Sequence, residues 1–292
     1  MASSVHTKGH RSWSAKRTLR RQLHRALAKL GAEPPLRDVS VHEARKELKR
    51  ARATIRLLRD DIGDTAYRRA NRRLRDAGRK LSRVRDAKVL LDTLAKLRVE
   101  TKQASGKAEL TALERNLRKD RQQARRDIQR PAGIRTVRRS VESVLSESRL
   151  WPAATPDSVR HGVERIYRKA RKAFARAKAD ARKTALHETR KQTKYLGKAL
   201  EVLAPSRTGR IAKRVKCANS IVGALGDDHD LAMLRKRLGG RSRSRSSRHG
   251  LLAHIERRRE KLQQKAAKRG RRLYRRKAKA FVDELDLGAR AH

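Results

Sequence analysis

The chain has 292 residues, of which 81 are Lys or Arg and 30 are Asp or Glu, so its formal net charge at pH 7 is +51. A charge this large predicts a strongly anionic partner. The single cysteine, Cys217, excludes an intramolecular disulfide framework and a cysteine-based zinc site. No apolar run is long enough for a membrane span or a signal peptide, so we expect a cytoplasmic protein that does not bind membranes.

The predicted elements are helices from one end of the chain to the other. Apolar residues recur at spacings of three and four, and the period-two alternation typical of strands is absent. Residues that favour helices, such as Ala, Leu, Arg, Lys and Glu, also dominate the composition. We therefore predict an all-α fold. The helical segments are expected at 14–30, 38–60, 65–98, 107–129, 157–203, 208–238 and 250–286.

Three breaks in the helical pattern suggest how the chain is divided. A turn is predicted around Gly63, which ends the second segment. The pattern weakens over 131–156, which predicts a linker between a first half at 10–130 and a second half at 157–285. The stretch 239–250 is rich in Arg and Ser, and we expect a mobile basic loop without a specific role there.

The two halves contain matching motifs. The segment 42–49 recurs as 187–194 with His, Glu, Arg, Lys and Lys in register. Further along each half, 81–86 matches 225–230 at nearly the same offset. Two matches in the same order predict an internal duplication. We therefore expect two four-helix bundles that pack about a pseudo-twofold axis.

Each repeated segment forms a basic stripe when it is placed on a helix. Apolar side chains occupy an arc of about 100°, and the cations occupy the neighbouring arc. Glu43 and Glu47 fall on the opposite flank, so we expect them to leave the cations unpaired, unlike the mixed charges of an ordinary exposed helix. The first stripe contains His42, Arg45, Lys46, Lys49, Arg52 and Arg56. The second stripe contains His187, Arg190, Lys191, Lys194 and Lys198.

The stripes are predicted to bind a linear polyanion. Side chains one turn apart repeat every ~5.4 Å, which suits a chain of phosphates better than a single phosphate. Arg binds phosphate with two parallel hydrogen bonds, and Lys acts as a mobile point charge. His42 and His187 are expected to be neutral hydrogen-bond donors; a structural role beside a carboxylate or carbonyl is the alternative. Asp86 and Asp230 are expected to orient cations or cap helices rather than perform chemistry.

These motifs resemble those of the CHAD family, the conserved histidine α-helical domain proteins. The first helix is similar to the family's His-x-x-Arg-x-x-x-Arg-Arg-x-Arg pattern at His42, Arg45, Lys49, Arg50 and Arg52, with Lys49 where arginine is commoner. The second helix resembles His-x-x-Arg-Lys-x-x-Lys-Tyr-Leu, which is matched at His187, Arg190, Lys191, Lys194, Tyr195 and Leu196. Ser82 stands where the family has glycine. The resemblance spans about 10–285 as a single domain.

The resemblance implies a function and further site residues. It implies that long-chain inorganic polyphosphate binds a basic surface or channel between the halves and directs the protein to polyphosphate granules. It also implies that Arg69, Arg72, Arg85, Lys213 and Lys216 join the binding surface. The Glu-x-Glu-x-Lys motif of the CYTH triphosphatase domain is absent, so we expect a stand-alone binding domain without catalysis, cofactor or metal, as a monomer or homodimer.

Two other functions remain open. Nucleic acid would bind any chain of this charge at low salt, although stacking aromatics and recognition motifs are absent. A metal-dependent phosphohydrolase is the second alternative, because His229 and Asp230 form a His-Asp dyad beside the acids Asp227 and Asp228. The first half lacks this dyad, since Arg85 stands in the place of His229.

Overall fold

The computed structural model describes residues 14–31, 37–100, 107–180, 182–203, 209–238 and 245–285. These ranges contain helices and no strand, which confirms the predicted all-α fold. The helices are α1 (Ala15–Leu30), α2 (Asp38–Leu57), α3 (Arg59–Lys80), α4 (Ser82–Glu100), α5 (Lys107–Gln129), α6 (Pro131–Glu147), α7 (Pro156–Ala179), α8 (Lys183–Leu203), α9 (Gly209–Leu238), α10 (Arg245–Leu273) and α11 (Ala278–Glu284).

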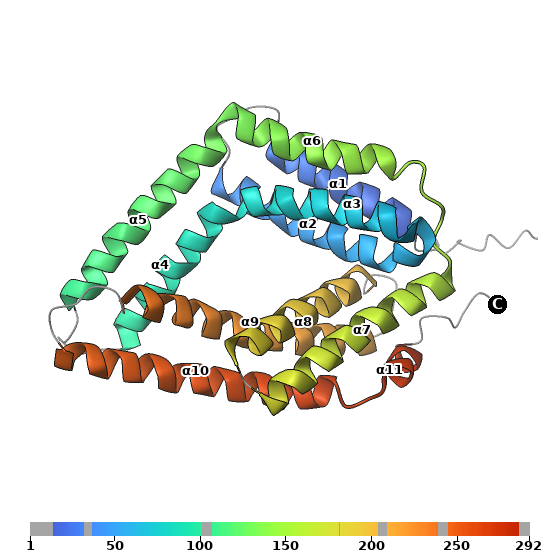
Figure 1. The fold of residues 1–292 in the computed structure, drawn as a ribbon. Helices are drawn as coiled ribbons and strands as arrows, with labels where there is room; N and C mark the ends of the chain where they lie inside the picture. Colours follow the sequence, from blue (N-terminus) through green and yellow to red (C-terminus); the bar gives the residue numbers. More distant parts are fainter. Residues whose placement is uncertain are drawn as a thin grey trace, which may run out of the picture.

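The first half is a four-helix bundle of α1, α2, α3 and α6 (Figure 1). Its core includes Leu19, Leu23, Leu48, Leu74 and Val141, all of them buried. These positions recur at helical spacing, so each helix turns one apolar stripe inward and leaves its charged side chains outside. The bundle therefore fixes which face of α2 can reach the second half.

The second half packs α7, α8, α9 and α10 together, and α11 covers α7 (Figure 1). The buried ring of Tyr167 stacks on Phe281 of α11, with ring centroids 3.9 Å apart. Ala53 and Leu57 of α2 belong to this second core. The first half is thus joined to the second by apolar packing as well as by the chain.

A third core joins the halves at their other end. Helices α4 and α5 extend together from the first half and reach α9 and α10 (Figure 1). Leu94 and Leu117 pack there with Leu234 and Ile255. Helix α9 is continuous over the region that corresponds to separate helices α3 and α4 in the first half. The internal duplication stays a prediction.

The predicted linker over 131–156 differs from the structure, since most of it is helix α6. Ile134, Val137, Val141 and Val144 are buried in the first core. Branched side chains have modest helix propensity, so the pattern looked weak, but burial of this apolar face stabilises the helix. Only residues 148–155 connect α6 to α7.

The structure also defines where the other predicted helical segments begin, end or divide. Gly63 has φ 76° and interrupts α3, so the chain breaks where the turn was predicted, but the second helix itself ends earlier, at Leu57. The predicted segments 65–98 and 157–203 are each two helices: α3 ends at Lys80 and α4 begins at Ser82, while α7 ends at Ala179 and α8 begins at Lys183. In the predicted loop at 239–250, residues 239–244 lie outside the described ranges, and 245–250 begin α10. No helix in the described ranges is long and apolar enough to cross a membrane.

Candidate anion-binding site

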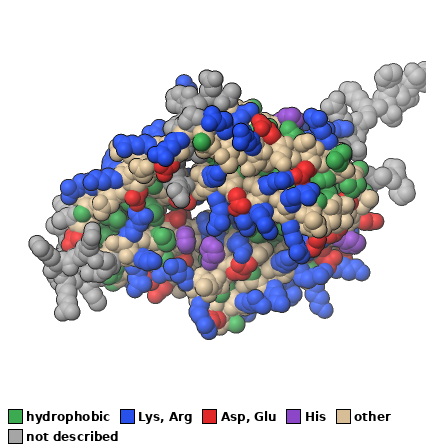
Figure 2. Space-filling view, turned by 45° about the horizontal axis from the view of Figure 1, so that its top comes forward, with side chains coloured by type: hydrophobic (Ala, Val, Ile, Leu, Met, Phe, Trp, Pro, Cys, Tyr) green, Lys and Arg blue, Asp and Glu red, His purple; other side chains and the backbone are tan. Residues whose placement is uncertain are grey.

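Helix α2 packs against α8 where the halves meet, and this contact brings the two basic stripes together. A cavity of about 400 Å³ lies between α2, α3 and α8. No described acidic residue lines it. The charged lining consists of Arg45, Lys49, Arg52, Arg56, Arg75, Arg79, His187, Arg190, Lys191, Lys194 and Lys198. We call this the central cavity. Figure 2 shows Lys and Arg side chains gathered across the middle of one face of the molecule.

A second cavity of about 280 Å³ continues from the central cavity toward α7. The two cavities share Arg52, Arg56, Arg75, Lys191 and Tyr195. The second one adds the cations Arg59, Arg165 and Lys169 to the lining. The shared residues place the two cavities side by side, and we call the two together the trench; side chains from both halves line it.

Arg45 and Arg190 occupy corresponding positions in the two halves. The Nη1 atom of Arg45 donates to the carbonyl oxygens of Leu81, at 3.1 Å, and Ser82, at 3.3 Å. The guanidinium of Arg190 lies against Gly226, where an added Cβ would be 3.4 Å from Nη2. The buried Nε of Arg190 has no hydrogen-bond partner among the described residues. Arg45 thus contacts the break between α3 and α4, and Arg190 contacts the matching segment of the continuous helix α9.

Lys49 and Lys194 line the central cavity from α2 and α8. Neither amine has a hydrogen bond or ion pair within the described part of the chain. Burial and, after it, the neighbouring cations Lys194, Arg45, Arg85 and Lys198 together lower the pKa of Lys49 to about 7. Burial also lowers the pKa of Lys194 to about 8, with Arg190 as the strongest neighbouring cation. A bound anion would favour the charged form of both amines.

Four other predicted site cations are paired with acids, contrary to the expectation that the acids would stay apart. Lys46 lies 3.4 Å from Glu43, and Arg50 lies 2.6 Å from Glu47. Lys198 pairs with Glu201 at 2.5 Å, and Lys191 pairs with Glu188. Long side chains three residues apart meet on a helix even when they start on different flanks. Of these four cations, only Lys191 and Lys198 line the central cavity.

The wall between the two cavities is held by side chains that leave its charge uncompensated. Arg52 donates from Nε to Asn71 Oδ1 at 3.1 Å, and Arg56 donates to the Arg52 carbonyl at 2.7 Å. The Arg56 guanidinium lies 3.8 Å from the ring centroid of Tyr195. Neutral partners and a ring face fix both cations without removing their charge.

Some predicted site residues lie outside the central cavity. Arg69 pairs with Glu147 of α6 at 3.1 Å, so it faces the first bundle. Arg72, Lys213 and Lys216 are exposed and do not line the cavity. These four were placed by alignment, which does not fix the face of a helix. Arg85 is absent from the lining but lies close enough to lower the pKa of Lys49 and Lys194.

Two lining residues, Arg75 and Arg79, escaped the sequence analysis. Asn219 and Gly223 stand at the matching places in the second half, so the search for repeated cations passed over both arginines. Their spacing of four, on the side of α3 away from the buried Leu74 and Ala77, was the available signal. A site made by one half alone cannot be found from a repeat.

The histidines and aspartates occupy different surroundings. His187 lines the central cavity, and its ring centroid lies 5.8 Å from that of His229. His42 is largely exposed and lies outside the cavity lining. The part of its side chain that is buried lowers its pKa, and the nearby cations Lys49, Arg45 and Arg85 act in the same direction against Glu43. Burial raises the pKa of Asp230 even though Arg190 opposes the shift. Asp86 is exposed and lies 3.6 Å from Arg85. Both aspartates are thus close to cations of the site.

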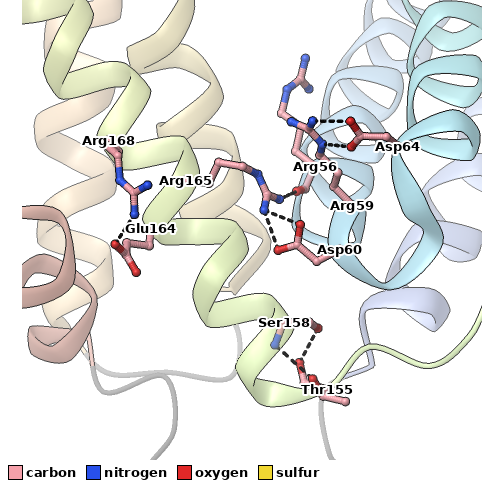
Figure 3. Close-up of polar contacts among 9 residues, drawn as sticks. All are labelled: Arg56, Arg59, Asp60, Asp64, Thr155, Ser158, Glu164, Arg165 and Arg168. Carbon is pink, nitrogen blue, oxygen red and sulfur yellow. Dashed lines mark hydrogen bonds and ion pairs between the residues drawn. The ribbon is translucent and has the colours of Figure 1, made fainter.

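A cluster of ion pairs joins α7 to the junction of α2 and α3 (Figure 3). Arg165 donates to both carboxylate oxygens of Asp60 at 2.6 Å and to the Arg56 carbonyl at 3.0 Å. Arg59 donates to Asp64 at 2.6 and 2.8 Å beside it (Figure 3). These contacts fix the end of the trench where the second half meets the first.

Asp228, next to the His229–Asp230 dyad, has a structural role. Asp228 is buried, and its Oδ1 accepts hydrogen bonds from Arg259 at 3.0 Å and from Gln263 at 2.9 Å. Within the described ranges, no group of three or more His, Cys, Asp or Glu side chains could hold a metal ion. The carboxylate of Asp228 is therefore engaged in holding α10 on α9.

Fold and site together define an all-helical domain with a cation-lined trench between two halves. The model of the CHAD domain family matches residues 14–239, so the chain belongs to the CHAD family. The crystal structure of the CHAD domain from the plant Ricinus communis is similar, with a TM-score of 0.54 and 19% sequence identity. That match covers 94% of this chain and 88% of the plant chain. A search of curated proteins finds no significant match.

Proposed function

We propose that the central cavity and its continuation bind long-chain inorganic polyphosphate. The observation that supports this most strongly is the composition of the lining, where cations from both halves meet without a described acidic side chain. A polyphosphate has one negative charge on each internal unit and no base to recognise. Charge-assisted hydrogen bonds from Arg and Lys therefore supply the main attraction.

Two features of the trench favour a polymer over one phosphate. The shared walls of the two cavities extend the row of cations from His187 to Lys169. Lys49, Lys194 and Arg79 have no ion pair with described residues, so an arriving phosphate does not have to displace a carboxylate from them. Binding along the trench offsets the mutual repulsion of these cations.

Competition with RNA tests this proposal, since the net charge of +51 gives nucleic acid a non-specific affinity. A fluorescent single-stranded RNA is bound to the protein at physiological salt and titrated with long-chain polyphosphate or unlabelled RNA, matched by phosphate concentration. We expect polyphosphate to displace the probe at a concentration at least about tenfold lower. Equal or better displacement by RNA would reject polyphosphate as the preferred ligand and favour the nucleic-acid alternative.

We propose that binding occurs without turnover and places the protein on polyphosphate granules. Incubation of the protein with polyphosphate and Mg²⁺, Mn²⁺ or Zn²⁺ is expected to release no orthophosphate. A release that disappears in His229→Ala would instead support the phosphohydrolase alternative. A fluorescent fusion should collect at granules in cells that make polyphosphate and spread evenly in cells that do not.

A further inference from the structure

The central cavity combines cations that can hold a phosphate with an amine that can react. Lys194, Arg45 and Lys198 are the lining cations that act on Lys49, which has no hydrogen bond or ion pair with the described residues. Arg190 lines the same cavity. The volume of the central cavity, about 400 Å³, falls within the range of about 300–1,000 Å³ that is usual for small-molecule sites. A small phosphate compound would therefore be held beside the Lys49 amine.

We propose that the Nζ amine of Lys49 is a preferred site of acylation by small acyl phosphates. The phosphate of the reagent would bind the arginines of the cavity, and its carbonyl carbon would lie beside the amine. The inference extends the proposed anion binding of this cavity to a second class of ligand. Because long-chain polyphosphate would occupy the same place, its binding would protect Lys49.

The reaction needs the neutral amine. Its lone pair forms a C–N bond with the carbonyl carbon, the bond from that carbon to the phosphate oxygen breaks, and orthophosphate leaves with the electron pair. The amine proton passes to the departing phosphate or to water. A lysine buried among other cations is a known type of activated nucleophile because its neutral form is populated near neutral pH.

The charged groups around Lys49 come from four helices. Arg45, Arg52, Arg190 and Lys194 line the same cavity from α2 and α8, and Arg75 and Arg79 do so from α3. Arg85 of α4 and Lys198 of α8 also lower the pKa of Lys49. All of these are cations, so they disfavour the protonated amine until an anion is bound.

Site-resolved mass spectrometry tests the proposal. The full chain is incubated with acetyl phosphate at about pH 7.5, a pH at which an amine with a pKa near 7 is mostly neutral, and the acetylation rate of each lysine is measured. Lys46 is the matched internal control, because it lies one turn away on α2 and pairs with Glu43. We expect Lys49 to react at least about tenfold faster than Lys46. An equal or lower rate at Lys49 would overturn the proposal.

A second comparison separates guidance by the cavity from simple reactivity. Arg79→Gln removes an exposed lining cation that has no hydrogen bond or ion pair with described residues, so the fold should tolerate it. This variant should lower the Lys49 rate several-fold with acetyl phosphate and leave it unchanged with an uncharged acetylating ester. Arg190→Gln should act in the same direction. If neither variant changes the rate with acetyl phosphate, the cavity does not position the reagent and the proposal is wrong.

The outcome is independent of the polyphosphate assignment. If polyphosphate binds tightly and Lys49 is not preferred, acylation is rejected and the proposed function stands. If Lys49 is preferred and polyphosphate fails to bind, the proposed function is rejected and the acylation site stands. If both hold, acetylated protein should bind polyphosphate several-fold more weakly, because N-acetyl-lysine has no charge.

Discussion

Lys49 and Lys194 are the residues on which pH should act most strongly. Both line the central cavity, and burial together with neighbouring cations lowers the pKa of Lys49 to about 7 and that of Lys194 to about 8. Arg45 stays charged at any ordinary pH, because burial lowers its pKa only to about 10. The lysines therefore set how the charge of the cavity changes near neutrality.

Polyphosphate affinity should fall as pH rises from about 6.5 to about 8.5. The free protein loses the charges of Lys49 and then Lys194 over this interval, whereas bound phosphate favours the protonated amines and raises their pKa. Binding should thus take up protons, which calorimetry in buffers of different ionisation enthalpy measures directly. In Lys49→Gln the pH dependence should be weaker. An affinity that is constant or rises over this interval would contradict the assigned surroundings of these amines.

The stability of the unliganded chain should rise with pH, whereas the affinity for polyphosphate falls. Between about pH 7 and pH 10 the unfolded chain keeps a proton on Lys49 that the folded chain has lost, so the free energy of unfolding rises with pH. Urea unfolding at several pH values measures this slope. Lys49→Gln removes the contribution and should flatten it, and an identical slope in both proteins would show that Lys49 is not the cause.

The sequence predicts most residues of the central cavity, but it does not predict the cations that occur in only one of the two halves. Arg45, Lys49, Arg190 and Lys194 came from the repeated motif and from helical angles. Arg75 and Arg79 belong to α3, whose place beside α2 and α8 depends on tertiary packing. The same limit explains why Lys46 and Arg50 were included, since periodicity does not show which cations a neighbouring acid will pair with.

Helix α7 approaches the backbone at the end of α2 closely. An added Cβ at Gly162 would lie 2.9 Å from the carbonyl oxygen of Leu57 and 3.1 Å from its Cα. Backbone atoms cannot move aside as a flexible side chain can. Glycine is therefore required at this position for the two halves to approach, and no motif in the sequence indicates this.

Gly162→Ala should lower the free energy of unfolding by about 1–3 kcal/mol because of overpacking. Gly223→Ala is the matched control, since a Cβ at that position of α9 meets nothing within 4 Å. Alanine is the better helix former, so the control should stabilise the protein by up to about 1 kcal/mol. Chemical denaturation compares the two. Stabilisation by Gly162→Ala would show that α7 does not lie so close to α2.

Helix α6 shows where local patterns mislead at the scale of an element. The linker was predicted because the helical pattern weakens between Pro131 and Pro156, with Trp151-Pro152 inside that stretch. The buried Val137, Val141 and Val144 nevertheless complete the first core. Tertiary burial therefore outweighs weak propensity here, and only the spacing of the valines carried that information.

In the whole molecule, the halves meet where α2 packs against α8 and also beyond both ends of the trench. The Arg165–Asp60 pair and the packing of Leu57 lie at one end, and α4 and α5 contact α9 and α10 at the other. Predicted repeats indicated two halves and a shared basic surface. They did not predict that α4 and α5 would leave the first bundle, because that depends on which apolar surface the second half offers.

The most direct measurement compares two quadruple variants with the same loss of formal charge. One replaces Arg45, Lys49, Arg190 and Lys194 in the cavity by Gln. The other replaces the exposed cations Lys96, Arg115, Lys119 and Lys265 by Gln. Thermal unfolding and circular dichroism confirm that each variant is folded, and calorimetry at physiological salt gives its Kd for long-chain polyphosphate. We expect the cavity variant to bind at least about a hundredfold more weakly and the control to change less than about threefold. Equal losses in the two variants would mean that total charge, and not this cavity, binds the polymer.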